Sequence, residues 1–277
     1  MTIKTTFSYY SLFIIFIVLT AGCHTSKYAK TDKVYKKLAK DFGKIIKATP
    51  PENQAIDSLP KDQQFWVGTT NMGIRRPNFV IIHHTAQDST AQTLMTFTMP
   101  KTQVSAHYVV GRDGKVYQMV NDYLRAQHAG VSRWGNSTDL NSSSLGIELD
   151  NNGFEPYSDQ QIKSLCVLLE TLKRKYSIPT ANFIGHADIA PTRKPDPSNF
   201  PWKVLADKGY GLWYDEILEI PPLTFDPIIA LRLIGYDVKN PDAAVIAFKR
   251  HFIQIDISPV LTDWDKTVLF NLHKKYL

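Results

Sequence analysis

The sequence predicts an α/β domain with a mixed central sheet flanked by helices, followed by a small three-helix domain. Three observations support this prediction. Hydrophobic residues make up 43% and charged residues 21% of the 277 residues, which is typical of an ordinary globular chain. From about 65 to 214, short apolar strand patterns alternate with helical patterns, as in sheets covered by helices. After the Ile-Pro-Pro sequence at 220–222, only helical spacing follows.

The first 22 residues have the pattern of a lipoprotein signal peptide. An apolar stretch at 7–20 follows the positive charge of Lys4, and it is short for a membrane span. The next residues, Leu-Thr-Ala-Gly-Cys, resemble the lipobox of bacterial lipoproteins, although the leucine stands one place further from the cysteine than usual. In such proteins the signal is cut before the cysteine and the thiol is lipidated. We therefore expect cleavage after Gly22 and a lipid on Cys23.

The segment 23–64 is interpreted as a lysine-rich tether and linker. Eight lysines and two acidic residues lie between 27 and 47, which accounts for much of the net charge of +6. No aromatic and basic motif of a nucleic-acid-binding module accompanies them, so no nucleic acid is expected as partner. One interpretation is contact with anionic lipid head groups or anionic wall polymer, and the other is a solvated tether. A short amphipathic helix is expected from apolar residues at helical spacing: Tyr35, Leu38, Phe42 and Ile45.

The central segment, 65–219, contains the patterns of the α/β domain. Its main helix is expected at 159–176, because Ser158 is placed to cap it and apolar residues recur at helical spacing. Cys166 belongs to this apolar stripe and is expected to pack as a small hydrophobic residue. The expected strands are short: a buried strand at 79–82, a hairpin at 106–119 that turns at 111–114, and strands at 145–149 and 182–185.

The C-terminal segment, 220–277, is expected to form a small helical domain. Helical patterns fall at about 227–235, 241–251 and 263–275, each after a turn or a proline. Three short helices form a module too small to carry much chemistry alone.

Histidines at two strand ends suggest a metal site. His83 and His84 end an apolar strand, and since neighbouring strand residues point to opposite faces, only one of them can enter a given site. His186 ends another strand, and polar candidates follow it in a loop: Asp188, Lys194 and Asp196. Two histidines and one carboxylate would suit a catalytic zinc, which takes three protein ligands and leaves a fourth position for water. Taken alone, this spacing is weak evidence, because a histidine at a strand end is more often an ordinary surface or core residue.

Five short motifs occur in order along the central segment. They are His-His-Thr-Ala at 83–86, Ser-Ala-His-Tyr at 105–108, His-Ala-Gly at 128–130, Leu-Gly-Ile-Glu-Leu at 145–149, and the stretch 186–197. Together they resemble the zinc-dependent N-acetylmuramoyl-L-alanine amidase family, which shares its fold with phage T7-type lysozyme and the animal peptidoglycan-recognition proteins. The AmiD-like branch of this family also pairs a lipobox with an amidase domain and a helical C-terminal module.

The resemblance implies hydrolysis of the amide bond between N-acetylmuramic acid and L-alanine of peptidoglycan. It places the zinc ligands on His83, His186 and Asp196, the general base on Glu148, and on Lys194 the cation that stabilises the oxyanion. The family usually has glycine after the Asp-Pro pair, whereas here Ser198 follows Pro197, so we expect an altered loop rather than a lost metal.

The substrate-binding residues are less well defined. His128 matches a histidine near the substrate cleft of the family. Three further residues are candidates because aromatic and amide side chains suit sugars and peptides, with packing inside a long loop as the alternative: Tyr123, Trp134 and Asn136.

The C-terminal segment resembles the three-helix peptidoglycan-binding domain through the stretches 231–237 and 244–252. Its third element departs from that pattern, because Ile-Asp-Ile-Ser-Pro stands at 255–259 where relatives often have a glycine-rich stretch. Wall binding by this module is therefore one interpretation, and a structural cap on the amidase domain is the other.

The expected cofactor is Zn²⁺, and the expected partners are peptidoglycan or muropeptides and a membrane reached through the lipid on Cys23. The expected location is the cell envelope, at the outer membrane facing the periplasm, because His24 rather than aspartate follows the cysteine. The main alternative function is a non-catalytic peptidoglycan-binding lipoprotein. A zinc peptidase that cuts within the stem peptide and a metal-free adhesion or scaffolding lipoprotein are further alternatives.

Overall fold

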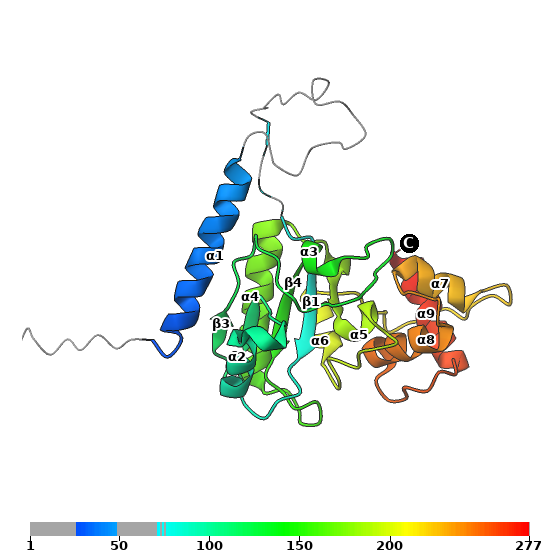
Figure 1. The fold of residues 1–277 in the computed structure, drawn as a ribbon. Helices are drawn as coiled ribbons and strands as arrows, with labels where there is room; N and C mark the ends of the chain where they lie inside the picture. The colour runs from blue at the N-terminus through cyan, green and yellow to red at the C-terminus, as the bar shows by residue number, and fades with distance from the viewer. Residues whose placement is uncertain (1–25, 49–70, 73, 75, 277) are drawn as a thin grey trace, which may run out of the picture. The chain divides into compact units, whose positions relative to one another are not determined.

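The computed structural model describes residues 26–48, 71, 72, 74 and 76–276 (Figure 1). Contacts divide the chain into two compact units, Met1–Met72 and Gly73–Leu277, and each is described by itself. The expected signal peptide at 1–22 and the expected lipidation site, Cys23, lie outside the described residues and stay predictions. No helix among the described residues is long and apolar enough to cross a membrane.

In the first unit, α1 (Ala29–Lys47) confirms the helix expected in the lysine-rich segment. Asp32 lies in its first turn, and Lys44 and Lys47 lie in its last turn, so the charges at both ends suit the helix dipole. None of its residues is buried. Its backbone hydrogen bonds are therefore not reinforced by a packed core.

The second unit is built on a five-stranded mixed sheet with the strand order β3-β2-β4-β1-β5. β1 is flanked by β4 and β5, both parallel to it, and β2 pairs in parallel with β4. β2 and β3 form the expected antiparallel hairpin. The predicted α/β fold with a mixed sheet is thus confirmed. The strands are β1 (Phe79–His84), β2 (Tyr108–Val110), β3 (Val116–Gln118), β4 (Ser144–Leu149) and β5 (Phe183–Gly185).

Side chains alternate between the two faces of the sheet. On one face, α4 (Asp159–Tyr176) packs Leu165 and Leu169 against strand residues that include Val80 and Ile147, and Cys166 is half-buried beside them. The opposite face carries a smaller cluster that includes Ile81 of β1. Ser158 caps α4 as expected by accepting a hydrogen bond from the backbone N–H of Gln161.

The remaining helices of this unit are short. Those that precede the C-terminal segment are α2 (Thr90–Thr98), α3 (Leu140–Ser143), α5 (His186–Ile189), α6 (Trp202–Ala206) and the 3₁₀ turns η4 (Pro100–Thr102) and η5 (Thr180–Asn182). The C-terminal segment forms α7 (Pro227–Ile234), α8 (Pro241–Phe248), the π-helical turn η6 (Lys249–Ile253) and α9 (Asp263–Tyr276), which confirms the expected helical content.

The C-terminal helices have a hydrophobic cluster of their own, which includes Leu231, Phe248 and Leu269. They nevertheless belong to the same compact unit as the sheet, and α7 to α9 lie beside α5 and α6 (Figure 1). The expected domain boundary at 219/220 stays a prediction.

Candidate metal centre and active site

The carboxyl ends of three neighbouring parallel strands carry the candidate active-site residues. His83 of β1 and Glu148 of β4 are register partners, so their side chains lie on the same face of the sheet. His186 follows β5 directly and begins α5. His84 is on the other face of β1, where its Nδ1 accepts a hydrogen bond from the backbone N–H of Ser198 at 3.1 Å. Strand alternation therefore separates the two adjacent histidines, as the sequence predicted.

Three buried ligand atoms converge where these strands end. His83 Nδ1 lies 2.9 Å from His186 Nδ1 and 3.2 Å from Asp196 Oδ2, and His186 Nδ1 lies 3.0 Å from the same Asp196 oxygen. They form a group of side chains that could hold a metal ion. Ligand atoms at 2.0–2.1 Å from a tetrahedral zinc lie about 3.3 Å from one another, which is close to the separations found here.

The hydrogen bonds around the two histidines indicate which ring nitrogens carry hydrogen. His186 Nε2 lies 3.1 Å from the carbonyl oxygen of Ala129. A carbonyl only accepts, so Nε2 carries the hydrogen in neutral His186, and Nδ1 then keeps a lone pair.

His83 reaches the same state through a longer chain of hydrogen bonds. The Ser144 hydroxyl donates to the carbonyl oxygen of Leu140 and so accepts from His128 Nε2, which is 3.2 Å away. His128 Nδ1 then accepts from His83 Nε2 at 3.0 Å. These bonds leave His83 Nδ1 with a lone pair as well. Two imidazole lone pairs and a carboxylate oxygen thus face one another within 3.2 Å, an arrangement that repels itself unless a cation lies between them.

The pKa shifts of these side chains favour the protonation states that bind a metal ion. Burial and the nearby His186 lower the pKa of His83 to about 4, so its imidazole is neutral near pH 7. Burial also lowers the pKa of His128 well below its ordinary value. Burial alone would raise the pKa of Asp196, but the adjacent His186 and His83 outweigh that effect and hold its pKa low. Neutral imidazole and ionised carboxylate are the forms that bind metal.

Glu148, the expected base, lies beside this group. Burial and the neighbouring Asp196 carboxylate raise the pKa of Glu148 to about 8, while Lys194 acts in the opposite direction. Its Oε2 atom is buried and has no hydrogen-bond partner. The Lys194 ammonium group makes no hydrogen bond or ion pair with any residue that the structure describes, so it is free to meet a ligand.

A pocket of about 350 Å³ opens over the metal-ligand group. Among its lining residues are His83, His128, Glu148, His186, Lys194 and Asp196. The structure therefore brings together all of the expected metal ligands, the expected base and the expected cation. His128 lies here as well, where it supports His83 from behind.

The other three candidate substrate-binding residues lie outside the lining of this pocket. Tyr123 is 46% exposed and its ring contacts Tyr176 at 6.0 Å between centroids. Trp134 packs edge-on against Tyr236. Asn136 lines a different pocket that includes Arg232 and Lys239. Substrate binding by Tyr123, Trp134 and Asn136 stays a prediction.

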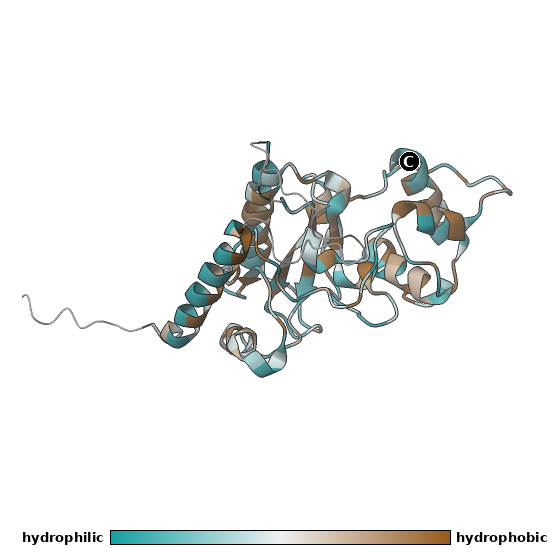
Figure 2. Cartoon of the chain, turned by 45° about the horizontal axis from the view of Figure 1, so that its top comes forward, coloured by the Kyte–Doolittle hydropathy of each residue, from teal (hydrophilic) through white to brown (hydrophobic). Residues whose placement is uncertain are grey.

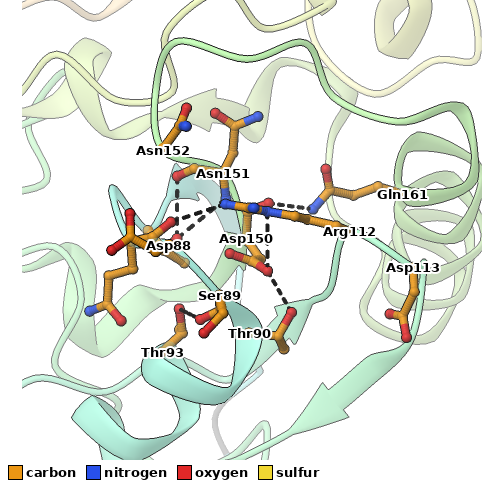
Figure 3. Close-up of polar contacts among 12 residues, drawn as sticks. Asp88, Ser89, Thr90, Thr93, Arg112, Asp113, Asp150, Asn151, Asn152 and Gln161 are labelled. Carbon is orange, nitrogen blue, oxygen red and sulfur yellow. Dashed lines mark hydrogen bonds and ion pairs between the residues drawn. The ribbon is translucent and has the colours of Figure 1, made fainter.

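A polar network holds the loop that follows β1, which forms part of the rim of the pocket (Figure 3). Arg112, just after β2, donates to the carbonyl oxygen of Gln87, which lines the pocket, and pairs with Glu155 at 2.8 Å. Its Nε lies 3.5 Å from the buried carboxylate of Asp150, which also accepts a hydrogen bond from Thr90 at 2.6 Å. Three separate loops are thereby held together at one edge of the site.

A second network joins the metal site to the C-terminal helices. Asp188 is 2% exposed and belongs to α5, the helix that begins at His186. One of its oxygens accepts hydrogen bonds from His251 Nδ1 and the backbone N–H of Gly185, and the other accepts from the Tyr236 hydroxyl at 2.9 Å. Sequence reasoning missed this role, because Tyr236 and His251 lie in the C-terminal segment and nothing in their spacing points to Asp188.

Comparison with known proteins gives a consistent result. A family profile described as N-acetylmuramoyl-L-alanine amidase matches residues 73–199. The chain is 36% identical over 211 residues to N-acetylmuramoyl-L-alanine amidase AmiD of Escherichia coli, covering 64% of this chain and 75% of that protein. It is 42% identical over 100 residues to 1,6-anhydro-N-acetylmuramyl-L-alanine amidase AmpD of Enterobacter cloacae, covering 36% of this chain and 54% of that relative.

Two solved structures share the fold. The complex of E. coli AmiD with anhydro-N-acetylmuramic acid-L-Ala-D-gamma-Glu-L-Lys has a TM-score of 0.66 at 31% identity, over 76% of this chain and 93% of that chain. AmpDh3 from Pseudomonas aeruginosa has a TM-score of 0.66 at 29% identity, over 79% of this chain and 99% of that chain.

Proposed function

Because the chain belongs to the N-acetylmuramoyl-L-alanine amidase family, we propose that it is a zinc-dependent enzyme that hydrolyses the amide bond between N-acetylmuramic acid and L-alanine of peptidoglycan. The observation that carries the zinc assignment is the convergence of three lone-pair atoms, from His83, His186 and Asp196, on one point. Two imidazole nitrogens and one carboxylate oxygen are a common ligand set of catalytic zinc. Muropeptides are the proposed substrates, since the related AmiD structure is a complex with one.

The residues around the metal site suit amide hydrolysis. When bound, zinc polarises a carbonyl group and lowers the pKa of its water to about 7. Glu148 accepts the proton of the attacking water and delivers it to the leaving nitrogen, for which its unpaired Oε2 is available. Its carboxyl ionises more readily beside a divalent cation than without one, because the positive charge favours the carboxylate. Lys194 meets the negative charge that develops on the carbonyl oxygen, where a fixed donor contributes roughly 3–4 kcal/mol.

We further propose that the mature chain is exported, carries a lipid on Cys23 and faces the periplasm from the outer membrane. The lipobox-like sequence supports export and lipidation. The relatives are named as amidases of N-acetylmuramoyl-L-alanine, a part of peptidoglycan, which supports a location in the cell envelope. The domain boundaries 1–22, 23–64, 65–219 and 220–277 belong to the same proposal. Wall binding by 220–277 is not required, because these helices already hold Asp188 in place.

The test is product analysis with residues 24–277, which lack the lipidated cysteine. Purified peptidoglycan and anhydro-muropeptides are each incubated with the protein, with and without a zinc chelator, and the products are identified by mass spectrometry. We expect free peptides that begin with alanine, together with sugar that has lost its stem peptide. Chelation should abolish these products and added zinc should restore them.

Other products would favour the alternative functions. Cleavage inside the stem peptide would identify a zinc peptidase. Intact peptidoglycan that retains the bound protein would indicate a recognition protein, and would leave the free Lys194 and the unpaired Glu148 without a role.

A further inference from the structure

The lysines and the apolar residues of α1 lie on opposite sides of the helix. Each residue advances about 100° around an α-helix, so the seven lysines fall in one sector of about 120°. The six larger apolar residues fall in an opposite sector of similar width. Figure 2 shows both hydrophilic and hydrophobic residues along the whole length of α1. The lysines are Lys30, Lys33, Lys36, Lys37, Lys40, Lys44 and Lys47, and the apolar residues are Val34, Tyr35, Leu38, Phe42, Ile45 and Ile46.

The apolar side of α1 is exposed. None of the helix residues is buried, and five large apolar side chains present between 45% and 81% of their surface: Val34, Leu38, Phe42, Ile45 and Ile46. Exposure of these neighbouring apolar side chains to water is unfavourable, and such a stripe is typical of a contact surface. The opposite side is strongly positive, since Asp32 and Asp41 are its only acidic residues and Asp41 already pairs with Lys37 and Lys44.

We propose that α1 lies flat on an anionic lipid membrane, with its apolar side among the acyl chains nearest the head groups and its lysines toward the phosphates. High segregation of charge, low overall hydrophobicity and lysines on the polar side are the properties of helices that lie in the membrane interface. The inference goes beyond the proposed amidase activity and does not depend on it.

An anionic lipid surface matches both sides of the helix. A soluble anionic polymer would neutralise the lysines but leave the apolar stripe in water. A second copy of the chain would cover the stripe but bring two lysine-rich surfaces together. Anionic lipid supplies negative head groups and an apolar interior at the same place.

The position of α1 in the sequence favours the same partner. The expected lipid on Cys23 stands six residues before Ala29. Six residues of extended chain span about 20 Å. A lipidated chain would therefore keep α1 at the membrane surface. The helix would then fix where the linker to the catalytic unit begins.

The test is flotation of residues 24–277, without lipid on the protein, with vesicles of phosphatidylglycerol and phosphatidylethanolamine or of phosphatidylcholine alone. We expect binding to the anionic vesicles that high salt weakens, and little binding to phosphatidylcholine. A Leu38→Ser/Phe42→Ser variant and a variant with Lys33, Lys37, Lys40 and Lys44 changed to Gln should each bind at least about tenfold more weakly.

The matched control removes exposed apolar residues elsewhere. Ile217 and Ile220 are 90% and 88% exposed, and an Ile217→Ser/Ile220→Ser variant should bind vesicles like the unchanged protein. All variants should retain hydrolysis of soluble muropeptide, so loss of vesicle binding with activity intact separates this inference from the proposed function.

Three outcomes would overturn the inference. The first is equal binding, or none, to both kinds of vesicle. The second is a loss of binding in the lysine variant but not in the Leu38→Ser/Phe42→Ser variant, which would indicate a purely electrostatic contact such as that with a soluble polyanion. The third is a lipid-free dimer that the Leu38→Ser/Phe42→Ser variant abolishes, which would identify a second copy as the occupant.

Discussion

At the scale of single residues, the site is organised by the lone pairs of His83, His186 and Asp196. Each histidine is oriented through its other ring nitrogen, His186 by the Ala129 carbonyl and His83 by His128. Both oriented imidazoles therefore present a bare nitrogen to the same point, and the Asp196 carboxylate supplies the negative charge that a divalent cation needs. Loss of a residue that orients a metal ligand from behind typically weakens metal binding about 10–100-fold.

Replacing Glu148 with glutamine should abolish catalysis without loss of metal. The amide keeps the shape of the side chain but cannot accept the proton of the attacking water, so kcat should fall by about 10²–10⁴. Release of muropeptide products and zinc content would be measured on the same sample. Glu170→Gln, a similar change at an exposed position of α4, is the control. Near-normal turnover in Glu148→Gln would remove Glu148 from the mechanism.

Replacing His128 with phenylalanine should weaken metal binding. The change keeps a ring of similar size but leaves His83 Nε2 without its acceptor, so zinc affinity should fall about 10–100-fold. Competition with a chromophoric chelator measures this directly. His273→Phe in α9 should leave the affinity unchanged.

Gly146 gives a second way to test the same contact. A Cβ atom at this position of β4 would approach the His128 ring to 2.4 Å. Gly146→Ala should therefore displace the ring and weaken metal binding in the same direction as His128→Phe. If both variants bind zinc normally, His128 does not orient His83.

At the scale of helices and strands, the sequence was most informative where a pattern extends over many residues. The helix at 159–176 was predicted to the residue, and the strand at 145–149 differs from β4 by one residue, since apolar periodicity and the Ser158 cap are local signals. Short elements such as α5 and the π-helical turn at Lys249–Ile253 could not be predicted. They are set by tertiary contacts, such as the bonds from Asp188 to Gly185 and His251.

The candidate site also contains residues that the sequence predicts well and residues that it predicts poorly. Motif resemblance identified His83, His186, Asp196, Glu148 and Lys194, and all of these lie around one pocket. Tyr123 and Asn136 were chosen for side-chain type alone, which carries no information about position. Neither residue lines this pocket, and their part in substrate binding stays a prediction.

A cluster around Asp122 ties the loop after β3 to β2 and α4, and it should make stability depend on pH. Burial on its own would raise the pKa of Asp122, but the hydrogen bonds that Tyr108, Tyr176 and Lys175 donate to its carboxylate outweigh burial, and its pKa lies below the ordinary value. Because the folded-state pKa is lowered, the stabilisation is complete above the unfolded-state pKa of about 3.9 and is lost as the pH falls below it.

Asp122→Asn should therefore lower the free energy of unfolding by about 1–3 kcal/mol at pH 7. The difference from the unchanged protein should shrink as the pH falls below about 4. Urea unfolding at several pH values measures it. Asp207→Asn breaks only an exposed pair with Lys203 and should have a much smaller effect. A difference for Asp122→Asn that stays constant down to low pH would show that ionisation is not its cause.

At the scale of the whole catalytic unit, the helices after 219 contact Asp188, which lies close to the candidate metal site. The Tyr236 hydroxyl and His251 come from the C-terminal segment, and the carboxylate they contact lies two residues after the ligand His186. Trp134 and Tyr236 add an aromatic contact across the same junction, at 4.9 Å between ring centroids. The segment that carries His186 and Asp188 is therefore contacted by residues that lie before and after the expected boundary at 219/220.

Tyr236→Phe should lower both stability and zinc affinity. It leaves one oxygen of a buried carboxylate without its donor, at a cost of about 1–3 kcal/mol. The displaced α5 should then hold His186 less well. Thermal unfolding with and without zinc, together with chelator competition, separates the two effects. Tyr214→Phe is the control, because the Tyr214 hydroxyl makes no hydrogen bond with any of the described residues. A loss of stability with unchanged zinc affinity would limit Tyr236 to packing.

The Asp188 network also bears on how such a chain can evolve. A domain joined only by a linker can be gained, lost or exchanged by recombination, and its host keeps working. Here the loss of the C-terminal helices would leave the buried Asp188 carboxylate without two of its three donors, beside a metal ligand. Truncation at 219/220 is therefore expected to disturb the segment that carries His186, so the C-terminal helices of this chain are not an independent module.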